Sequence, residues 1–324
     1  MKLGGWIVAA AIVAASLCVV PVAEFAVAQT AAPEAAASAE APQAAKATTP
    51  ATPDVAAPKK GLATKAIEAA RSVASQAGDI LTRVPCLPAK GAAAVPGSLP
   101  RVARRIAAGD PVTIIAFGSS TTVGYGTSST AYTYPNRLAD QLRRKFPTAD
   151  ITIINRGMGG TDAPEMMKRF DTAVLNDNPD LVIWQLGTNT VVKGSAADIE
   201  ATKALLEDGI SRLQAKGIDV VLIDPQYVPA VTAKPENASS MVKLLGQVAK
   251  LKNVSVFPRF EIMRQWHEDE KLPFDTFVIG DGLHMNDWGY ACFAQLLGDT
   301  IIKSVGEVRA GINTPTNVMT FRPM

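Results

Sequence analysis

Two short segments, far apart in the chain, carry the groups that activate a serine hydroxyl. The first is GSSTT at 118–122, which directly follows an apolar run and places hydroxyls on a turn. The second is DGLH at 281–284, where the three-residue spacing lets Asp281 reach Nδ1 of His284 and leaves Nε2 for a serine. A serine attacks a carbonyl only when a base removes its proton, so these segments predict nucleophilic catalysis on an acyl group.

The oxyanion formed by such an attack needs hydrogen-bond donors, and two further segments offer them. NRGMGG at 155–160 and GTN at 187–189 each follow a predicted strand. Glycine lets backbone N–H groups approach a substrate closely, and Asn189 supplies a neutral side-chain N–H. The chain has only two histidines. The other one, His267 in the acidic segment WHEDE at 266–270, is the alternative base and resembles a solvated helix end.

The elements that must position these groups alternate between strand and helix patterns. Short apolar runs rich in β-branched residues predict buried parallel strands at Val112–Phe117, Ile151–Asn155, Leu181–Leu186, Val220–Ile223 and Val254–Phe257. Apolar residues at helical spacing predict helices at 135–146, 163–175, 197–216, 239–251 and 288–305. We therefore predict a three-layer αβα sandwich around a five-stranded parallel sheet, with its chemistry in the loops after the first three strands.

These blocks, in this order, resemble the SGNH hydrolase superfamily, also called GDSL esterases and lipases, over residues 112–305. The resemblance implies a flavodoxin-like fold, Ser120 as nucleophile and Asp281 with His284 as its partners. It also implies oxyanion donors at Asn189, Gly160 and the Ser120 N–H, and two-step acyl transfer without a cofactor. The family's aspartate before the nucleophile is Ser119 here, which leaves Ser119 as the alternative nucleophile, and its aspartate after the asparagine is Thr190.

Other kinds of site and partner are less well supported by the residues. We expect no metal site, because the cysteines and histidines are scattered and show no zinc spacing. The glycine-rich segment 118–124 lacks the lysine of a phosphate-binding loop. A net charge of +2 names no partner, and we expect no nucleic-acid partner. An excess of Lys and Arg between residues 59 and 110 is compatible with contact with an anionic cell envelope, but a solvated helix face explains it better.

The N-terminal third of the chain has the composition of an exported protein. Lys2, an apolar run at 6–20 and an A-x-A site ending at Ala28 predict a signal peptide at 1–28 that is cleaved after Ala28 and leaves no membrane span. Residues 29–60, rich in Ala, Pro and Thr, predict a disordered linker. We expect an accessory helical segment at 61–110, the hydrolase domain at 111–307 and a tail at 308–324. The expected location is periplasmic or secreted.

Cys86 and Cys292 are the cysteines that remain after cleavage, and we expect them to form a disulfide or to stay as two buried thiols.

The loop at 124–135 is polar and offers no long apolar lid, which favours a polar acylated substrate. Tyr125, Tyr132 and Trp288 are candidates for stacking on sugar rings, and Tyr134 and Trp288 equally fit core packing.

The predicted function is an O-acetylesterase acting on an envelope or extracellular polysaccharide. The alternatives are a lipase, thioesterase or general carboxylesterase with the same triad, an O-acyltransferase, and a non-catalytic polysaccharide-binding protein. The last alternative would use the basic segment around Arg101, Arg104 and Arg105, but it has no use for Asp281 and His284.

Overall fold

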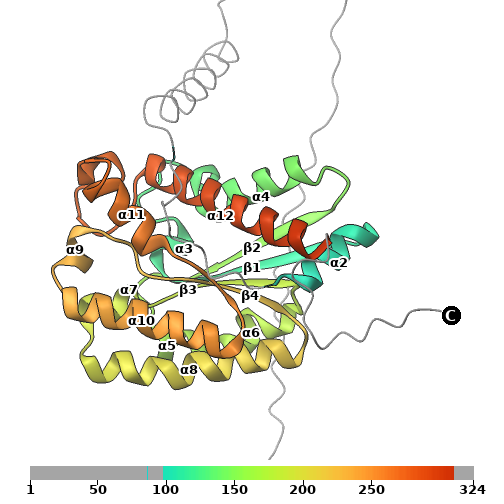
Figure 1. Ribbon diagram of the computed structural model, residues 1–324, viewed down its shortest axis with the longest axis horizontal. Coiled ribbons are helices and arrows are strands. Elements are labelled where there is room, and N and C mark those ends of the chain that lie inside the picture. The colour runs from blue at the N-terminus through green and yellow to red at the C-terminus, as the bar shows by residue number, and fades with distance from the viewer. Residues whose placement is uncertain (1–85, 87–97, 310–324) are drawn as a thin grey trace, which may run out of the picture. The chain divides into compact units, whose positions relative to one another are not determined.

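The computed structural model describes Cys86 and residues 98–309 (Figure 1). The predicted signal peptide, linker and helix at 61–84, and the tail beyond residue 309, lie outside these residues. Five parallel strands form one sheet in the order β2-β1-β3-β4-β5. The strands are β1 (Val112–Gly118), β2 (Ile151–Gly157), β3 (Leu181–Gln185), β4 (Asp219–Ile223) and β5 (Ser255–Phe257).

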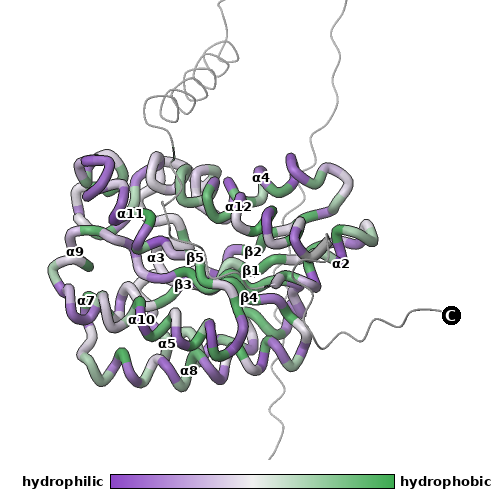
Figure 2. Tube along the Cα trace, in the orientation of Figure 1, coloured by the Kyte–Doolittle hydropathy of each residue, from purple (hydrophilic) through white to green (hydrophobic). Residues whose placement is uncertain are grey.

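The strands lie at the predicted positions because their apolar runs are buried on both faces. Every residue of β3, β4 and β5 is buried, whereas the edge strand β2 is half-exposed along much of its length. Figure 2 shows hydrophobic residues concentrated in the strands and on the inner sides of the helices. The predicted α/β class and the five-stranded parallel sheet are confirmed.

Helices cover both faces of the sheet (Figure 1). One face is covered by α2 (Pro100–Ala108), α4 (Tyr134–Lys145) and α12 (Asp287–Arg309), and the other by α5 (Ala163–Lys168), α8 (Ala196–Ala215) and α10 (Pro235–Lys252). The other α-helices of the described residues are α3 (Ser120–Val123), α6 (Phe170–Ala173), α7 (Thr188–Lys193), α9 (Pro229–Thr232) and α11 (Arg259–Glu268).

The single helix predicted at 163–175 is wrong, because the chain forms two short helices, α5 and α6. The junction is Arg169, whose backbone departs from helical geometry at φ −109° and ψ 9°. Its guanidinium turns inward, donates to the carbonyls of Arg156 and Gly118, and lies 4.4 Å from the centroid of the Phe117 ring. The long-range contacts of this one side chain therefore outweigh the local helical pattern.

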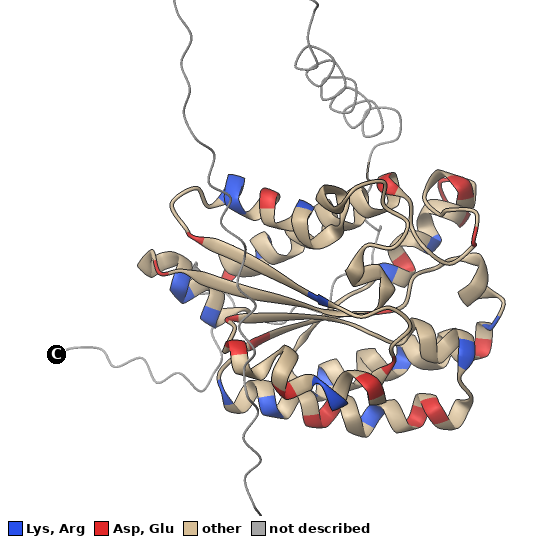
Figure 3. Cartoon of the chain, turned by 180° about the vertical axis from the view of Figure 1, so that it is seen from behind, with Lys and Arg blue, Asp and Glu red and all other residues tan. Residues whose placement is uncertain are grey.

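The segment before β1 belongs to the packed domain, although we expected the domain to begin at residue 111. Leu99 and Val102 of this segment are buried in the same core as the sheet. The Val102 N–H at the start of α2 donates to Asp219 in β4 over 2.9 Å. Arg101 donates to Asp180 over 2.7 Å. Arg101, one of the cations of the basic segment, thus pairs with an acidic residue of the fold, and Figure 3 shows cationic and anionic residues interspersed along the helices.

A disulfide joins Cys86 to Cys292 in α12 across 206 residues, with the two Cα atoms 5.1 Å apart. Cys292 is fully buried. Within residues 98–309, no helix combines the length and hydrophobicity needed to span a bilayer.

Candidate active site

The predicted site residues lie at the carboxyl ends of the strands, where the sheet order reverses. Since β1 lies between β2 and β3, the loops after these three strands meet at one edge. The turn after β1 begins α3 at Ser120, the loop after β2 contains Gly160, and α7 after β3 contains Asn189. The DGLH segment reaches the same edge from the loop that precedes α12.

Ser120, His284 and Asp281 form a hydrogen-bonded chain. The Ser120 Oγ lies 2.8 Å from the His284 Nε2. The His284 Nδ1 lies 2.6 Å from the Asp281 Oδ2. With the proton on Nδ1, Nε2 is free to accept the serine proton, which is the arrangement that general-base activation requires.

The Asp281 carboxylate is held by the backbone of its own loop. Its Oδ1 accepts the N–H groups of Leu283 and His284 over 2.8 and 2.9 Å. Partial burial by itself raises the pKa of Asp281, but these hydrogen bonds and the His284 side chain lower it more, so the pKa lies below its ordinary value. Asp281 is therefore ionised at neutral pH and fixes the orientation of the imidazole.

The two alternative residues have other partners. The Ser119 hydroxyl is buried and donates to the Gln185 Oε1 over 3.0 Å. The His267 Nδ1 lies 2.9 Å from the Leu272 carbonyl oxygen, and its ring stacks on Phe274 with the centroids 3.9 Å apart. Neither side chain is placed to act with the Ser120–His284 pair.

Asn189 connects α7, which follows β3, to the loop that follows β2. Its Nδ2 donates one hydrogen to the Thr161 carbonyl over 2.9 Å, which fixes the loop that contains Gly160. An amide nitrogen carries two hydrogens, so one remains for a substrate. Gly160 has a φ of 76°, in the left-handed region that favours glycine. Within the described residues, the N–H groups of Ser120 and Gly160 have no hydrogen-bond acceptor. These three groups can stabilise an oxyanion.

Both departures from the family pattern have structural consequences. The first departure is Ser119. The Gln185 Oε1 accepts its hydroxyl and its N–H, each over 3.0 Å, and also accepts the Thr122 hydroxyl over 3.3 Å. At the second, the buried Thr190 hydroxyl has no hydrogen-bond partner within the described residues, and Asn189 is anchored through Thr161 instead.

The roles of three residues of the site were not predicted from the sequence. Gln185 holds the Ser119–Ser120 turn, Asn155 donates to the Thr122 carbonyl over 2.7 Å, and Gln226 donates to the Leu283 carbonyl over 3.0 Å. Asn155 and Gln185 could have been noticed because they are polar residues within or directly after apolar strand runs. Their partners are distant in sequence and could not be read from any local pattern.

The aromatic candidates for substrate binding differ in exposure. Tyr125 is 57% exposed, and its ring centroid lies 4.4 Å from that of His284. Tyr132 is half-buried, with the Arg137 guanidinium 4.6 Å from its ring centroid. Trp288, for which the sequence allowed either sugar stacking or core packing, lies in the core, because its ring is buried and packs edge-on against Trp266. Tyr134 is likewise buried, leaving Tyr125 as the aromatic candidate that lies beside the triad.

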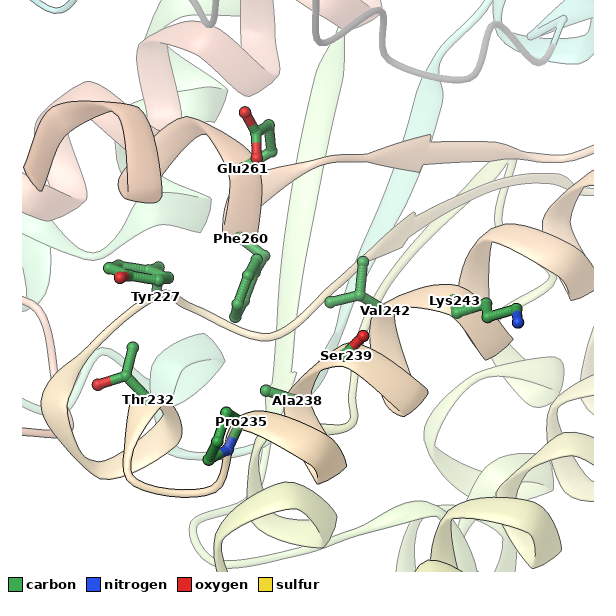
Figure 4. A pocket seen from close by; sticks show the side chains of 9 residues that line it. All are labelled: Tyr227, Thr232, Pro235, Ala238, Ser239, Val242, Lys243, Phe260 and Glu261. Carbon is green, nitrogen blue, oxygen red and sulfur yellow. The ribbon is translucent and has the colours of Figure 1, made fainter. Parts of the chain in front are cut away.

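A cavity of about 480 Å³ lies between α9, α10 and α11 (Figure 4). The rings of Tyr227 and Phe260 face it across Pro235 and Ala238. No triad residue lines this cavity. It is therefore separate from the candidate active site.

The fold and the sequence have known relatives. Residues 85–307 match the model of the non-GDSL lipase-like family. A two-domain esterase (CEX) active on acetylated mannans has a TM-score of 0.55 at 23% identity, covering 68% of this chain and 56% of its own. This chain thus spans little more than half of that esterase.

Two further solved structures have similar folds. TesA has a TM-score of 0.51 at 19% identity, covering 59% of this chain and 99% of its own. An acetylxylan esterase from Geobacillus stearothermophilus has a TM-score of 0.51 at 15% identity, covering 60% of this chain and 94% of its own. At these identities the structural likeness shows the fold alone. The search of curated proteins gave no significant match.

The family assignment rests on the sequence match, which covers well over half of the chain and the whole sheet. The five-stranded parallel sheet agrees with it. The chain therefore belongs to the non-GDSL lipase-like family.

Proposed function

We propose that the protein is an exported serine O-acetylesterase that removes acetyl groups from an envelope or extracellular polysaccharide. The single observation that carries the catalytic part is the hydrogen-bonded chain from Ser120 through His284 to Asp281, with distances of 2.8 and 2.6 Å. No metal or cofactor is needed for this chemistry, because the base, the nucleophile and the oxyanion donors are all side-chain or backbone groups.

The reaction proceeds in two steps. The Ser120 Oγ attacks the ester carbonyl carbon as its proton passes to the His284 Nε2, and Asn189 with the N–H groups of Gly160 and Ser120 stabilises the oxyanion. The carbon–oxygen bond to the sugar breaks, and His284 gives its proton to the sugar oxygen. Water then attacks the acetyl-enzyme with His284 again as base, which releases acetate and restores the Ser120 hydroxyl.

The substrate proposal is supported by the surroundings of the triad and by two structural neighbours. Tyr125 offers an exposed ring beside His284, and such a ring can stack on a sugar. Two solved structures with the same fold are described as esterases of acetylated mannan and acetylated xylan.

Export is supported by the N-terminal sequence and by the disulfide. The apolar run at 6–20, followed by an A-x-A site, has the form of a cleavable signal. Disulfides persist mainly in oxidising compartments, and Cys86 is joined to Cys292. N-terminal sequencing of the mature protein produced by its host tests this part: a start at Gln29 supports export, and a start at Met1 contradicts it.

Substrate choice is tested by comparing purified protein on acetylated xylan and mannan with its activity on p-nitrophenyl acetate and p-nitrophenyl octanoate. We expect acetate release from a polysaccharide and a higher kcat/KM for the acetate ester. A pocket for long chains would gain about 0.8 kcal/mol for each buried methylene, so a clear preference for octanoate would favour a lipase or thioesterase instead. Transfer of acetyl to an added sugar acceptor would reveal an acyltransferase.

A further inference from the structure

The base and the oxyanion donors lie on separate pieces of chain whose relative position must be fixed. Asn189 stands on α7 directly after β3, so the sheet fixes its position. His284 lies in a loop between α11 and α12. Catalysis depends on the distance between such groups to within about 0.5 Å, so a contact that joins the histidine loop to α7 has direct consequences for the reaction.

Gln226 makes this connection with a single amide group. Its Oε1 accepts the Thr188 hydroxyl over 3.1 Å, and its Nε2 donates to the Leu283 carbonyl over 3.0 Å. Thr188 directly precedes Asn189, and Leu283 directly precedes His284. The Gln226 side chain is 1% exposed, so water cannot replace either bond without opening the structure.

The bond to Leu283 also affects the orientation of the histidine. The Leu283 carbonyl and the His284 N–H belong to one planar peptide unit, and that N–H donates to Asp281 over 2.9 Å. A rotation of this peptide would therefore disturb the Asp281–His284 contact together with the distance from Nε2 to Ser120. Gln226 restrains the rotation from the carbonyl side, and Asp281 restrains it from the N–H side.

We propose that Gln226 is a positioning residue that fixes the loop containing His284 relative to α7, the helix containing Asn189. The proposal rests on the proposed function of Ser120, His284 and Asn189. Gln226 takes no part in proton transfer. It acts through Leu283 and Thr188, and its loss leaves every reacting group present while the geometry between them loosens.

The first test is Gln226→Met, which keeps the length of the side chain and removes both hydrogen bonds. We expect kcat for p-nitrophenyl acetate to fall about 10- to 100-fold with KM changed less than about threefold, at a temperature where the variant is folded. The matched control is Gln214→Met. Gln214 donates to the Lys252 carbonyl over 2.6 Å and joins α8 to the end of α10, away from the triad. The Gln214→Met variant should keep the wild-type kcat, because the bond that it removes is exposed and lies outside the site.

The second test is Gln226→Glu, whose outcome depends on pH. A carboxylate accepts the Thr188 hydroxyl but repels the Leu283 carbonyl, whereas a protonated carboxyl donates to that carbonyl as the amide does. Burial raises the pKa of an introduced carboxyl, so the protonated form is populated as the pH falls from 8 to 6. We expect the ratio of variant to wild-type kcat to rise over this range, which a purely structural defect does not predict.

The outcomes separate the two proposals. Wild-type kcat in Gln226→Met, or a variant-to-wild-type ratio for Gln226→Glu that is constant with pH, overturns the positioning role. If Gln226→Met does not fold, the pH dependence of Gln226→Glu decides alone. Wild-type protein without Ser120-dependent hydrolysis instead overturns the proposed function.

Discussion

At the scale of single residues, adjacent serines have different environments. Ser119 is buried against Gln185, whereas the Ser120 hydroxyl lies against His284. The order of the sequence blocks indicated Ser120 as the nucleophile, but only the structure shows that the Ser119 hydroxyl is bonded to another residue. The partner, Gln185, lies 66 residues further along the chain, which is why sequence patterns could not reveal it.

Asn189→Ala would remove two groups of interactions at once: the bond to Thr161 and the proposed oxyanion contact. We expect Asn189→Ala to lower kcat for p-nitrophenyl acetate by about 100- to 1000-fold, because an oxyanion donor is lost and the Gly160 loop loses its anchor at Thr161. The control is Asn136→Ala, which removes an exposed side-chain bond to the Thr130 carbonyl and should leave kcat unchanged. Equal activities of the two variants would exclude Asn189 from the oxyanion site.

At the scale of elements, strand positions were predicted from sequence but the packing between loops was not. The loop after α3 is pressed against the histidine loop: a Cβ on Gly126 would lie 2.3 Å from the Met285 carbonyl oxygen and 3.4 Å from the His284 Cβ. Nothing in the spacing of residues 124–126 predicts this contact, because it depends on where a loop more than 150 residues later comes to lie.

This contact predicts a difference between two glycines with similar backbone angles. Gly126 and Gly109 have φ values of 95° and 73°, but a Cβ on Gly109 meets nothing within 4 Å. Both alanine variants should lose about 1 kcal/mol or more of stability from backbone strain. Only Gly126→Ala should also reduce kcat, by at least tenfold, because it displaces His284. Steady-state kinetics beside urea unfolding separates these effects, and wild-type kcat in Gly126→Ala would contradict them.

The contact between α2 and β4 predicts a pH dependence of stability. Burial raises the pKa of Asp219 to about 7, although its bond from the Val102 N–H lowers it in part. An unfolded Asp has a pKa of about 3.9, so the folded state binds this proton more tightly. The associated stabilisation is complete below pH 4 and is lost as the pH rises through about 7.

Asp219→Asn tests whether the stability falls with rising pH because of this carboxyl group. The amide oxygen still accepts the Val102 N–H, and no charge is buried at high pH. We expect the wild-type free energy of unfolding to fall by roughly 2 to 4 kcal/mol between pH 4 and pH 8 through this group, and the variant to show a smaller fall. Urea denaturation at both pH values measures the difference. An unchanged slope in the variant would mean that Asp219 is ionised throughout.

At the scale of the whole molecule, the disulfide connects the segment before α2 to the last helix. The pairing of Cys86 with Cys292 was one of two expectations from the cysteine count, and spacing alone could not choose between them. The alternation of strands and helices was predictable because buried strands form short apolar runs, whereas helices place apolar residues at helical spacing. The interruption at Arg169 was not, since its contacts with Gly118 and Arg156 are tertiary.

Removal of the disulfide should lower stability without changing the chemistry. In Cys86→Ala/Cys292→Ala we expect the free energy of unfolding to fall by about 2 to 4 kcal/mol, mainly because the unfolded chain regains the freedom of a long closed loop. The kcat of the folded variant should match that of the wild type, because the disulfide is not part of the hydrogen-bonded chain from Ser120 to Asp281. Urea unfolding and ester kinetics on the same preparation check both statements, and unchanged stability would contradict the first.

The most direct test of the account is the hydrolysis of p-nitrophenyl acetate by wild-type protein, Ser120→Ala and Ser119→Ala. The Ser120–His284 geometry predicts that Ser120→Ala loses at least about 1000-fold in kcat, and that Ser119→Ala, which keeps its backbone bond to Gln185, stays within about tenfold of the wild type. Full activity in Ser120→Ala, or loss of activity in Ser119→Ala alone, would contradict the assignment of Ser120 as nucleophile.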